Sequence, residues 1–390
     1  MTKPAAACLI LAICGGAGRA SAQTMSDAVG FLLTNRTIAT DDFLRDAQAA
    51  RAASDAVSQL FQIDLSTLPV STSSGGFTYR FDRSLGLSVR SADTFDPFFT
   101  KRALTAGRRQ LTVGITYQQS AFRTIDGRAL EDGTLISTAS RIHGDTGFFD
   151  VETVTMRLRA DTATVVATAG ITDRLEAGAA LPMVRITLDG QRLDTYRGRE
   201  TLQATASATS SGPGDALVYT KYELRRDAAT GVAIGAEARL PTGSARNLRG
   251  SGKISAGPLL IASLGGERTS VHANVGYAAG GLGNSFDYSG AAEYAASGRL
   301  TLIGEVIGHR IADVGRLTEI DEAHPTLANI DTVRLSSTNQ PISRVVAVAG
   351  MKWNFRSTWL LSANVLRPLT DSGLNAAWTP TITLDHSFGQ

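Results

Sequence analysis

Cysteine is almost missing from this chain. Its 390 residues contain only Cys8 and Cys14, and both lie in a segment with the features of an export signal. That segment has a basic start at Lys3, a short apolar run, and small residues just before Gln23, where a signal peptidase would cut. We predict a signal peptide over residues 1–22 and a mature chain without cysteine. Such a chain excludes a disulfide-stapled secreted scaffold and any thiolate metal site.

Long apolar runs and an excess of charge are also lacking. No stretch after the signal approaches the roughly 18 consecutive apolar residues of a membrane-spanning helix. The chain has 38 basic and 36 acidic residues, and loss of Lys3 and Arg19 with the signal leaves the mature chain formally neutral. This balance provides no basic surface for nucleic acid, which is not an expected partner. The mean hydropathy of −0.01 does not by itself distinguish a soluble protein from a membrane protein.

The composition divides the chain into three parts. The signal peptide, residues 1–22, is followed by a helical segment and connector over 23–107 and by a β-rich region over 108–390. The connector is rich in Ser, Gly, Thr and Pro and contains one predicted hairpin, Phe77 to Arg90. From Gln110 onward the helical spacing of apolar residues disappears.

Apolar and polar residues alternate with a period of two through most of the β-rich region. One apolar face and one polar face is the pattern of a half-buried antiparallel strand. The alternation is clearest in six segments, at 111–118, 232–240, 270–277, 286–294, 347–355 and 378–388.

The connections between these segments have two lengths. Alternating short turns and long loops are typical of outer-membrane barrels, with the short turns in the periplasm and the longer loops outside. Short polar turns are expected at Thr172–Arg174, Arg226–Thr230, Gly265–Arg268, Ser297-Gly298 and Arg356–Thr358. Long polar loops are expected at about 124–146, 190–213, 243–254 and 313–341.

The length of the β-rich region sets the number of strands. At roughly 20–25 residues per strand and connection, residues 108–390 hold about 12 strands, with roughly 10 to 14 as the accepted range. One long segment does not fit the strand length of this pattern. Val151 to Ile171 is too long for a single spanning strand and its apolar phase reverses near Asp161, which predicts an extra hairpin or a β-bulge.

The apolar face of these strands is expected to face lipid. A soluble exported β-sandwich would alternate in the same way with its apolar face inward, and it stays as the alternative. Many mid-strand apolar residues are alanine, which would pack a core poorly, and aromatic residues lie at strand ends, as in the girdles of membrane barrels. We predict an all-β fold, a transmembrane antiparallel up-and-down β-barrel with a short N-terminal helical segment. The expected girdle consists of Trp353, Phe355, Trp359, Trp378 and Phe388.

A series of short motifs follows in order in the second half of the chain. The series resembles the outer-membrane transporter family associated with meta-cleavage phenol-degradation pathways, over about residues 170–390. The resemblance implies a barrel that passes small molecules, with hydrophobic or aromatic ones among the candidates. The motif residues are Gly214, Asp215, Lys221, Tyr222, Pro241, Thr242 and Gly243, followed by Val275-Gly276-Tyr277.

The polar faces of the predicted strands provide a candidate lining for the barrel lumen. Its charges are of both signs, so weak ion selectivity is expected rather than a filter of one sign. The plainer interpretation of any single residue is that it lies inside a closed barrel and pairs with a neighbour. The candidate lining consists of Lys221, Glu223, Glu237, Arg239, His272, Asn274, Glu293, Glu305, His309, Lys352, Asn354 and Asp385.

Two arrangements are candidates for a metal or catalytic site. Glu305 and His309 share one strand face, but they lie about 13 Å apart at the rise of a strand, too far to bind one metal ion. His386 and Ser387 are adjacent, yet their side chains point to opposite faces of a strand, which does not suit a hydrolase. We expect no catalysed reaction, no metal and no cofactor.

A helix is expected over residues 40–62, before the barrel. Its apolar residues recur at three- and four-residue steps, and Asp41 and Asp42 supply the negative charge that suits a first turn. A shorter helix is expected to start at Ser26-Asp27. The longer helix either plugs the lumen or lies in the periplasm as a partner-binding or oligomerising segment. Its apolar stripe alone indicates no more than a docking face for its own barrel.

Together these patterns predict an outer-membrane protein of a Gram-negative-type bacterium that acts as a passive channel for small molecules. Its partners would be outer-membrane lipid and a small-molecule solute, and its oligomeric state stays open. One alternative is a structural or surface-interaction barrel whose loops at 124–146 and 313–341 bind a partner outside. An outer-membrane lipid hydrolase is the third hypothesis. Solute-dependent swelling of liposomes distinguishes a channel from a structural barrel.

Overall fold

The structure is a computed structural model that describes most of the chain. The described residues are 24–67, 79–82, 87–90, 94–227, 230–266 and 268–388. The predicted signal peptide, 1–22, lies outside them. The helices are α1 (Met25–Leu33) and α2 (Phe43–Thr67). The strands are β1 (Tyr79–Asp82), β2 (Leu87–Arg90), β3 (Leu111–Ile125), β4 (Arg128–Ala129), β5 (Leu135–Ile142), β6 (Phe148–Gly170), β7 (Leu175–Tyr196), β8 (Arg199–Pro213), β9 (Ala216–Arg226), β10 (Thr230–Leu240), β11 (Ser255–Gly265), β12 (Thr269–Gly280), β13 (Ser285–Ser297), β14 (Leu300–Ala323), β15 (Ile330–Arg356), β16 (Trp359–Pro368), β17 (Leu374–Ala376) and β18 (Thr379–Phe388).

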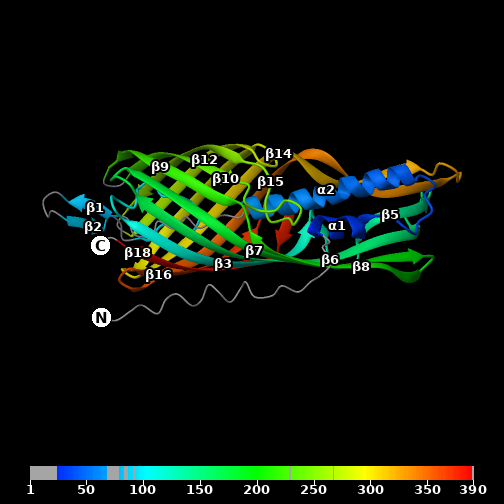
Figure 1. Ribbon diagram of the computed structural model, residues 1–390, viewed down its shortest axis with the longest axis horizontal. Helices are drawn as coiled ribbons and strands as arrows, with labels where there is room; N and C mark the ends of the chain where they lie inside the picture. Colours follow the sequence, from blue (N-terminus) through cyan, green and yellow to red (C-terminus); the bar gives the residue numbers. More distant parts are fainter. Residues whose placement is uncertain are drawn as a thin grey trace.

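Twelve strands close into a ring (Figure 1). The order around the ring is β3, β6, β7, β9, β10, β11, β12, β13, β14, β15, β16 and β18, and each strand pairs antiparallel with both neighbours. The ring closes where Leu111 of β3 pairs with Phe388 of β18. The predicted antiparallel barrel of about 12 strands is therefore confirmed.

The apolar face of the strands points outward. Val165, Leu260 and Met351 are 45%, 53% and 47% exposed, whereas the alternating polar residues Thr164 and Lys352 are buried. A soluble β-sandwich would bury the apolar set instead, so that alternative is excluded. An outward apolar surface on a closed antiparallel ring is the surface that a transmembrane barrel presents to lipid. No helix in the described part of the chain is long and apolar enough to cross a membrane.

The two rims of the ring differ. We call the rim with the short turns, which includes Leu111 and Phe388, the near rim. The five predicted short turns all connect ring strands there. Beyond the opposite, far rim, β6, β7, β14 and β15 continue past the ring (Figure 1). There β5 pairs with β6 and β15, β8 pairs with β7, and β14 stays paired with β15. We call this additional sheet the extension. β1 and β2 form a separate hairpin beyond the near rim, at the position predicted from the sequence.

Two of the predicted long loops are mostly strand. The segment 190–213 contains the end of β7 and all of β8, and the segment 313–341 contains the paired ends of β14 and β15. The loop prediction was wrong because it took segments of polar residues to be loops without paired backbone groups. Outside the lipid a strand has no need of an apolar face, and the backbone groups of both hairpins bond across the pair.

The long segment from Val151 to Ile171 contains no hairpin and no bulge. β6 is one strand of 23 residues, and its register with β3 and β7 is continuous. The even-numbered residues point inward throughout. Thr162 and Thr164 face the lumen, whereas Met156 and Leu158 face the helices of the extension. The apolar phase therefore reverses because the surroundings of the same face change from polar to apolar.

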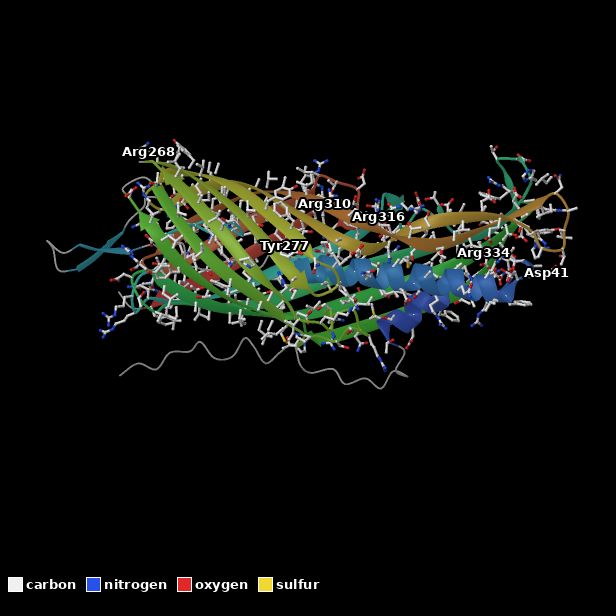
Figure 2. All side chains as sticks on the ribbon, turned by 90° about the horizontal axis from the view of Figure 1, so that it is seen from above. Asp41, Arg268, Tyr277, Arg310, Arg316 and Arg334 are labelled. Atoms are coloured by element: carbon white, nitrogen blue, oxygen red, sulfur yellow. The ribbon has the colours of Figure 1, made fainter. Side chains whose placement is uncertain are left out.

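The helices lie in the concave side of the extension. α1 packs on α2, β7 and β8, and α2 packs on β14 and β15. The first turn of α2 is capped by Asp42, which accepts a hydrogen bond from the Arg45 N–H at 3.1 Å. The other end of α2 meets the ring, where Phe61 contacts Phe122 with ring centroids 5.3 Å apart. Most of α2 thus lies beyond the ring, and its last turns reach the far mouth of the lumen (Figures 1 and 2).

Buried charges join the chain after α1 to the tip of the extension. Arg192 and Glu152 are both fully buried and lie 3.7 Å apart. Asp150 and Asp194 lie beside them. Burial, then a hydrogen bond with Asp194 and the charges of Asp194 and Glu152, raise the pKa of Asp150 to about 7.

This raised pKa predicts that the stability of the tip of the extension depends on pH. The folded chain holds a proton that an unfolded aspartate, with a pKa of about 4, releases. The proton therefore stabilises the tip at low pH, and this contribution is lost as the pH rises through about 7. Hydrogen exchange at residues 148–152, corrected for intrinsic rates, should be slower at about pH 5 than at about pH 8. Asp150→Asn should remove the difference, and Asp189→Asn, at an exposed site, should keep it. A difference that survives Asp150→Asn would contradict the assignment.

Candidate functional site

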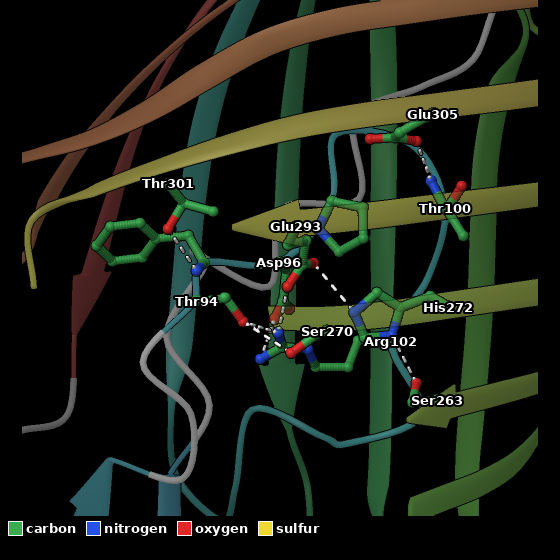
Figure 3. A network of polar contacts seen from close by, with 12 residues as sticks. Thr94, Asp96, Thr100, Arg102, Ser263, Ser270, His272, Glu293, Thr301 and Glu305 are labelled. Atoms are coloured by element: carbon green, nitrogen blue, oxygen red, sulfur yellow. Dashed lines mark hydrogen bonds and ion pairs between the residues drawn. The ribbon is translucent and has the colours of Figure 1, made fainter. Parts of the chain in front are cut away.

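A segment that precedes the barrel fills the near half of its lumen. We call residues 94–110, from Thr94 to Gln110, the lumen segment. Phe95, Ala103 and Thr105 of this segment are fully buried, although none belongs to a helix or strand. The segment lies within the ring, against the inner faces of the barrel strands (Figure 3).

Glu305 on β14 binds the backbone of the lumen segment. Its carboxylate accepts hydrogen bonds from the N–H groups of Phe98 and of Phe99, the latter at 3.2 Å. It also accepts one from the Thr100 N–H at 2.9 Å (Figure 3). Three converging N–H groups compensate a buried carboxylate. Lys352 donates to the Pro97 carbonyl at 3.1 Å. Side chains of the barrel wall therefore satisfy backbone groups that no regular structure pairs.

An ion-pair network holds the middle of the segment. Arg102 lies 2.6 Å from Glu293 and 3.2 Å from Asp96. Glu293 also lies 3.1 Å from His272, whose Nδ1 is 2.8 Å from the Ser263 hydroxyl (Figure 3). All of these charged side chains are buried. Buried charges require such pairing, because an unpaired charge is expensive away from water.

The end of the segment is bound by Lys221 and Glu176. Lys221 Nζ donates to the carbonyls of Arg102 at 2.9 Å and Leu104 at 2.8 Å, and it pairs with Glu176 at 3.3 Å. Glu176 accepts a hydrogen bond from the Ala106 N–H at 2.9 Å. These contacts lead the chain to the near rim, where β3 begins.

Lys101 of the lumen segment bonds to three strands of the wall. Its ammonium pairs with Glu237 and lies 3.9 Å from the ring centroid of Tyr219. Its backbone N–H and carbonyl face the amide of Asn274. The resulting anchor combines a charge pair, a cation–π contact and backbone hydrogen bonds.

A cavity of about 170 Å³ lies toward the far rim, lined by β10–β14 and by the end of α2. Ile63 of α2 lines it, together with apolar side chains such as Leu259. Its polar residues include Arg239 and the pair formed by His309 and Asp287 at 2.6 Å. The cavity therefore offers both apolar and charged surface to a small molecule.

The predicted lining residues fall into three groups, according to what their side chains contact. Seven contact the lumen segment or its ion-pair network: Lys221, Glu237, His272, Asn274, Glu293, Glu305 and Lys352. Arg239 and His309 line the cavity. Glu223 and Asp385 are buried in the wall, and Asn354 bonds to the Ser357 carbonyl at the near rim.

Sequence reasoning missed the residues that fill the lumen. Asp96, Lys101 and Arg102 were assigned to a connector, and Glu176 was not among the candidates. The signal was nevertheless present, because a segment with aromatic residues at 95, 98 and 99 beside two cations differs from an ordinary solvated linker.

Five of the motif residues, namely Gly214, Asp215, Pro241, Thr242 and Gly243, lie together at the far rim. Asp215 accepts hydrogen bonds from the Gly243 N–H at 3.0 Å and the Ser251 N–H at 2.7 Å. The Thr242 hydroxyl donates to the Gly214 carbonyl at 2.7 Å. These contacts fold the β10–β11 connection back onto the start of β9. Pro241 begins that connection, Lys221 points into the lumen, and Tyr222 is exposed on the outer face.

The predicted girdle residues lie on the outer face at strand ends. Trp353 and Phe355 are paired near the near rim, with ring centroids 5.8 Å apart. At the far rim Arg367 lies over Trp378. His386 lies on the outer face and contacts the rings of Trp359 and Phe388.

Ser387, in contrast, faces the lumen and bonds to Thr112. The two adjacent residues that were weighed as a hydrolase pair are thus on opposite faces. Within the described ranges, no three His, Cys, Asp or Glu residues gather into a group that could hold a metal ion.

Comparison with known proteins finds similarity only at the level of structure. No protein-family model and no curated protein matches the chain. The COG4313 outer membrane channel from Pseudomonas putida F1 is 12% identical, with 73% of this chain and 98% of that chain covered and a TM-score of 0.47. The NanC porin is 9% identical over 72% and 100% of the two chains, with a TM-score of 0.37. A FadL homologue of Pseudomonas aeruginosa is 10% identical over 82% and 97%, with a TM-score of 0.31. These scores are low, and the barrel assignment rests on the strand pairing of this chain.

The contacts of Asp215 predict a local role in stability. Asp215→Ala removes the acceptor of two backbone N–H groups, which should cost about 1–3 kcal/mol in the β10–β11 connection. Trypsin should then cut the native protein about tenfold faster at Arg246 or Arg249. Asp132→Ala, in another exposed far-rim loop, is the control and should leave these cuts unchanged. Equal cleavage of both variants would contradict this role.

Proposed function

We propose that the protein is an outer-membrane channel for small molecules, and that the lumen segment is its gate. The segment is held by hydrogen bonds and ion pairs to a polar wall, and this observation carries the proposal. When the segment moves, water can replace each of those contacts, since the wall residues are charged or polar. An apolar core would lose far more on hydration. The proposal includes a signal peptide over residues 1–22 that exports the chain. It also includes a boundary after residue 107 between the N-terminal segment and the barrel.

The chemistry of the cavity supports small, partly apolar solutes. Apolar side chains such as Leu259 and Ile63 line it beside Arg239 and His309, so a molecule with an apolar body and one polar group finds both kinds of contact. The family resemblance points to the same class, hydrophobic or aromatic molecules. The lining carries both signs of charge, which favours weak ion selectivity.

A reversible crosslink tests the gate. A Cβ added at Gly231 would lie 3.0 Å from the Ala103 Cβ, a few tenths of an ångström inside the usual spacing of a disulfide, about 3.5–4.5 Å. In liposome swelling, oxidised Ala103→Cys/Gly231→Cys should pass solutes at least tenfold more slowly than the same protein after reduction. Sugars, aromatic acids and apolar phenols form the solute panel.

The matched control is each single cysteine variant, which should not respond to oxidant or reductant. Equal fluxes in the oxidised and reduced forms, with the disulfide verified by mobility on a gel, would show that the lumen segment does not gate. A folded barrel that passes no solute in either state would contradict the channel itself.

The extension favours a second candidate, a surface-interaction barrel without transport. Phe43 and Leu44, at the start of α2, are 87% and 69% exposed. Two large apolar side chains exposed side by side at the tip of a projecting sheet are typical of a contact point. The liposome-swelling assay distinguishes this candidate from a channel, because a surface-interaction barrel would fold and yet pass no solute.

A further inference from the structure

The strand connections orient the barrel in the membrane. In outer-membrane barrels the short turns face the periplasm and the longer connections face outward. All five connections between ring strands at the near rim are short, whereas at the far rim only the β12–β13 connection, 281–284, is short. The first ring strand begins at the near rim with Leu111, and the last reaches it at Phe388. The near rim is therefore the periplasmic one, and the extension projects from the cell.

The N-terminal helices lie on the outer side in this orientation. Figure 2 shows Asp41, before α2, and Arg268, in a near-rim turn, at opposite ends of the molecule. The first turns of α2 are tied to the tip of the β14–β15 hairpin. Arg334 pairs with Asp46 at 2.7 Å, and Arg45 pairs with Glu322 at 3.1 Å.

The chain then returns through the ring. α2 ends at the far mouth, where Asp64 pairs with Arg344. The lumen segment, 94–110, lies inside the ring, and Leu111 begins β3 at the near rim. Along the sequence the described residues therefore lie first outside the ring on the far side, next in the β1–β2 hairpin beyond the near rim, then in the lumen, and then at the periplasmic rim.

We propose that residues 24–67 form a cell-surface cap and that they reach the surface through the lumen of their own barrel. An exported chain arrives in the periplasm, so a segment found beyond the far rim has crossed the membrane. The lumen is the polar route across the ring, and the lumen segment that follows the cap still occupies it. The barrel thus has a further activity, the translocation of its own N-terminal segment, which requires no solute.

The composition of the cap suits this route. Residues 24–67 contain no cysteine, proline, tryptophan or tyrosine, and many are alanine, so the unfolded segment is narrow. Its apolar side chains find their partners only outside. Leu32, Val57 and Leu60 are buried in a core that also contains residues of the extension. Folding onto the extension therefore retains the cap once it has passed.

Single cysteines test the location of the cap, because the mature chain is expected to have none. Gln48 is exposed on α2, and Arg268 is exposed in a near-rim turn. A membrane-impermeant maleimide is added to intact cells that express either Gln48→Cys or Arg268→Cys. Gln48→Cys should be labelled at least tenfold above the unmodified chain, and Arg268→Cys only after the outer membrane is permeabilised. Labelling of Gln48→Cys only after permeabilisation would overturn the proposal.

A fused domain tests the route. A small domain closed by disulfides, too wide for the lumen, is placed between the signal peptide and Thr24 of the Gln48→Cys variant. Surface labelling should fall at least tenfold, while the barrel still changes its gel mobility on boiling. A flexible Gly/Ser extension of equal length is the control and should preserve labelling. Full labelling with the closed domain would overturn the lumen route. Both readouts are independent of solute flux, so they distinguish this proposal from the channel.

Discussion

Every backbone N–H and C=O group that enters lipid must be paired within the protein, and the rest of this structure depends on that constraint. A closed ring of strands meets it, because each strand bonds to both of its neighbours. Closure between β3 and β18 leaves no strand edge in the spanning part. Because both faces of such a wall are covered, by lipid outside and by water or protein inside, side chains of two kinds must alternate along each strand.

Closure also creates an interior with its own requirement. The inner faces carry charges such as Glu305, Glu293 and Lys221, which are stable only in contact with water or with partners of suitable charge. The lumen segment, which lies inside the ring but belongs to none of its strands, supplies these partners: backbone N–H groups for Glu305 and Arg102 for Glu293. One short irregular segment thus neutralises the charges of the wall, and the proposed gate depends on the exchange of these contacts for water.

The sequence predicted the ring more fully than the site. In segments such as 347–355 the alternation shows directly which face meets lipid, because one face of a spanning strand contacts lipid along its whole length. The strand count and the short turns followed. In the extension the strand faces contact helices and solvent instead of lipid and the lumen. For this reason β6 looked irregular in the sequence, and the hairpins near 196 and 326 looked like loops. The lining residues were recognised as inward-facing polar groups, yet their partner, residues 94–110, shows no periodicity that pattern analysis detects.

What the sequence by itself determined is local and repetitive: export features, the alternation of two faces, and the positions of the turns. Each depends on neighbours one to four residues away. Only the tertiary structure decided that α2 covers the far mouth, that the connector fills the lumen, and that Asp215 binds the loop after Gly243. These contacts join residues far apart along the chain, and closure of the ring is the physical event that brings them together.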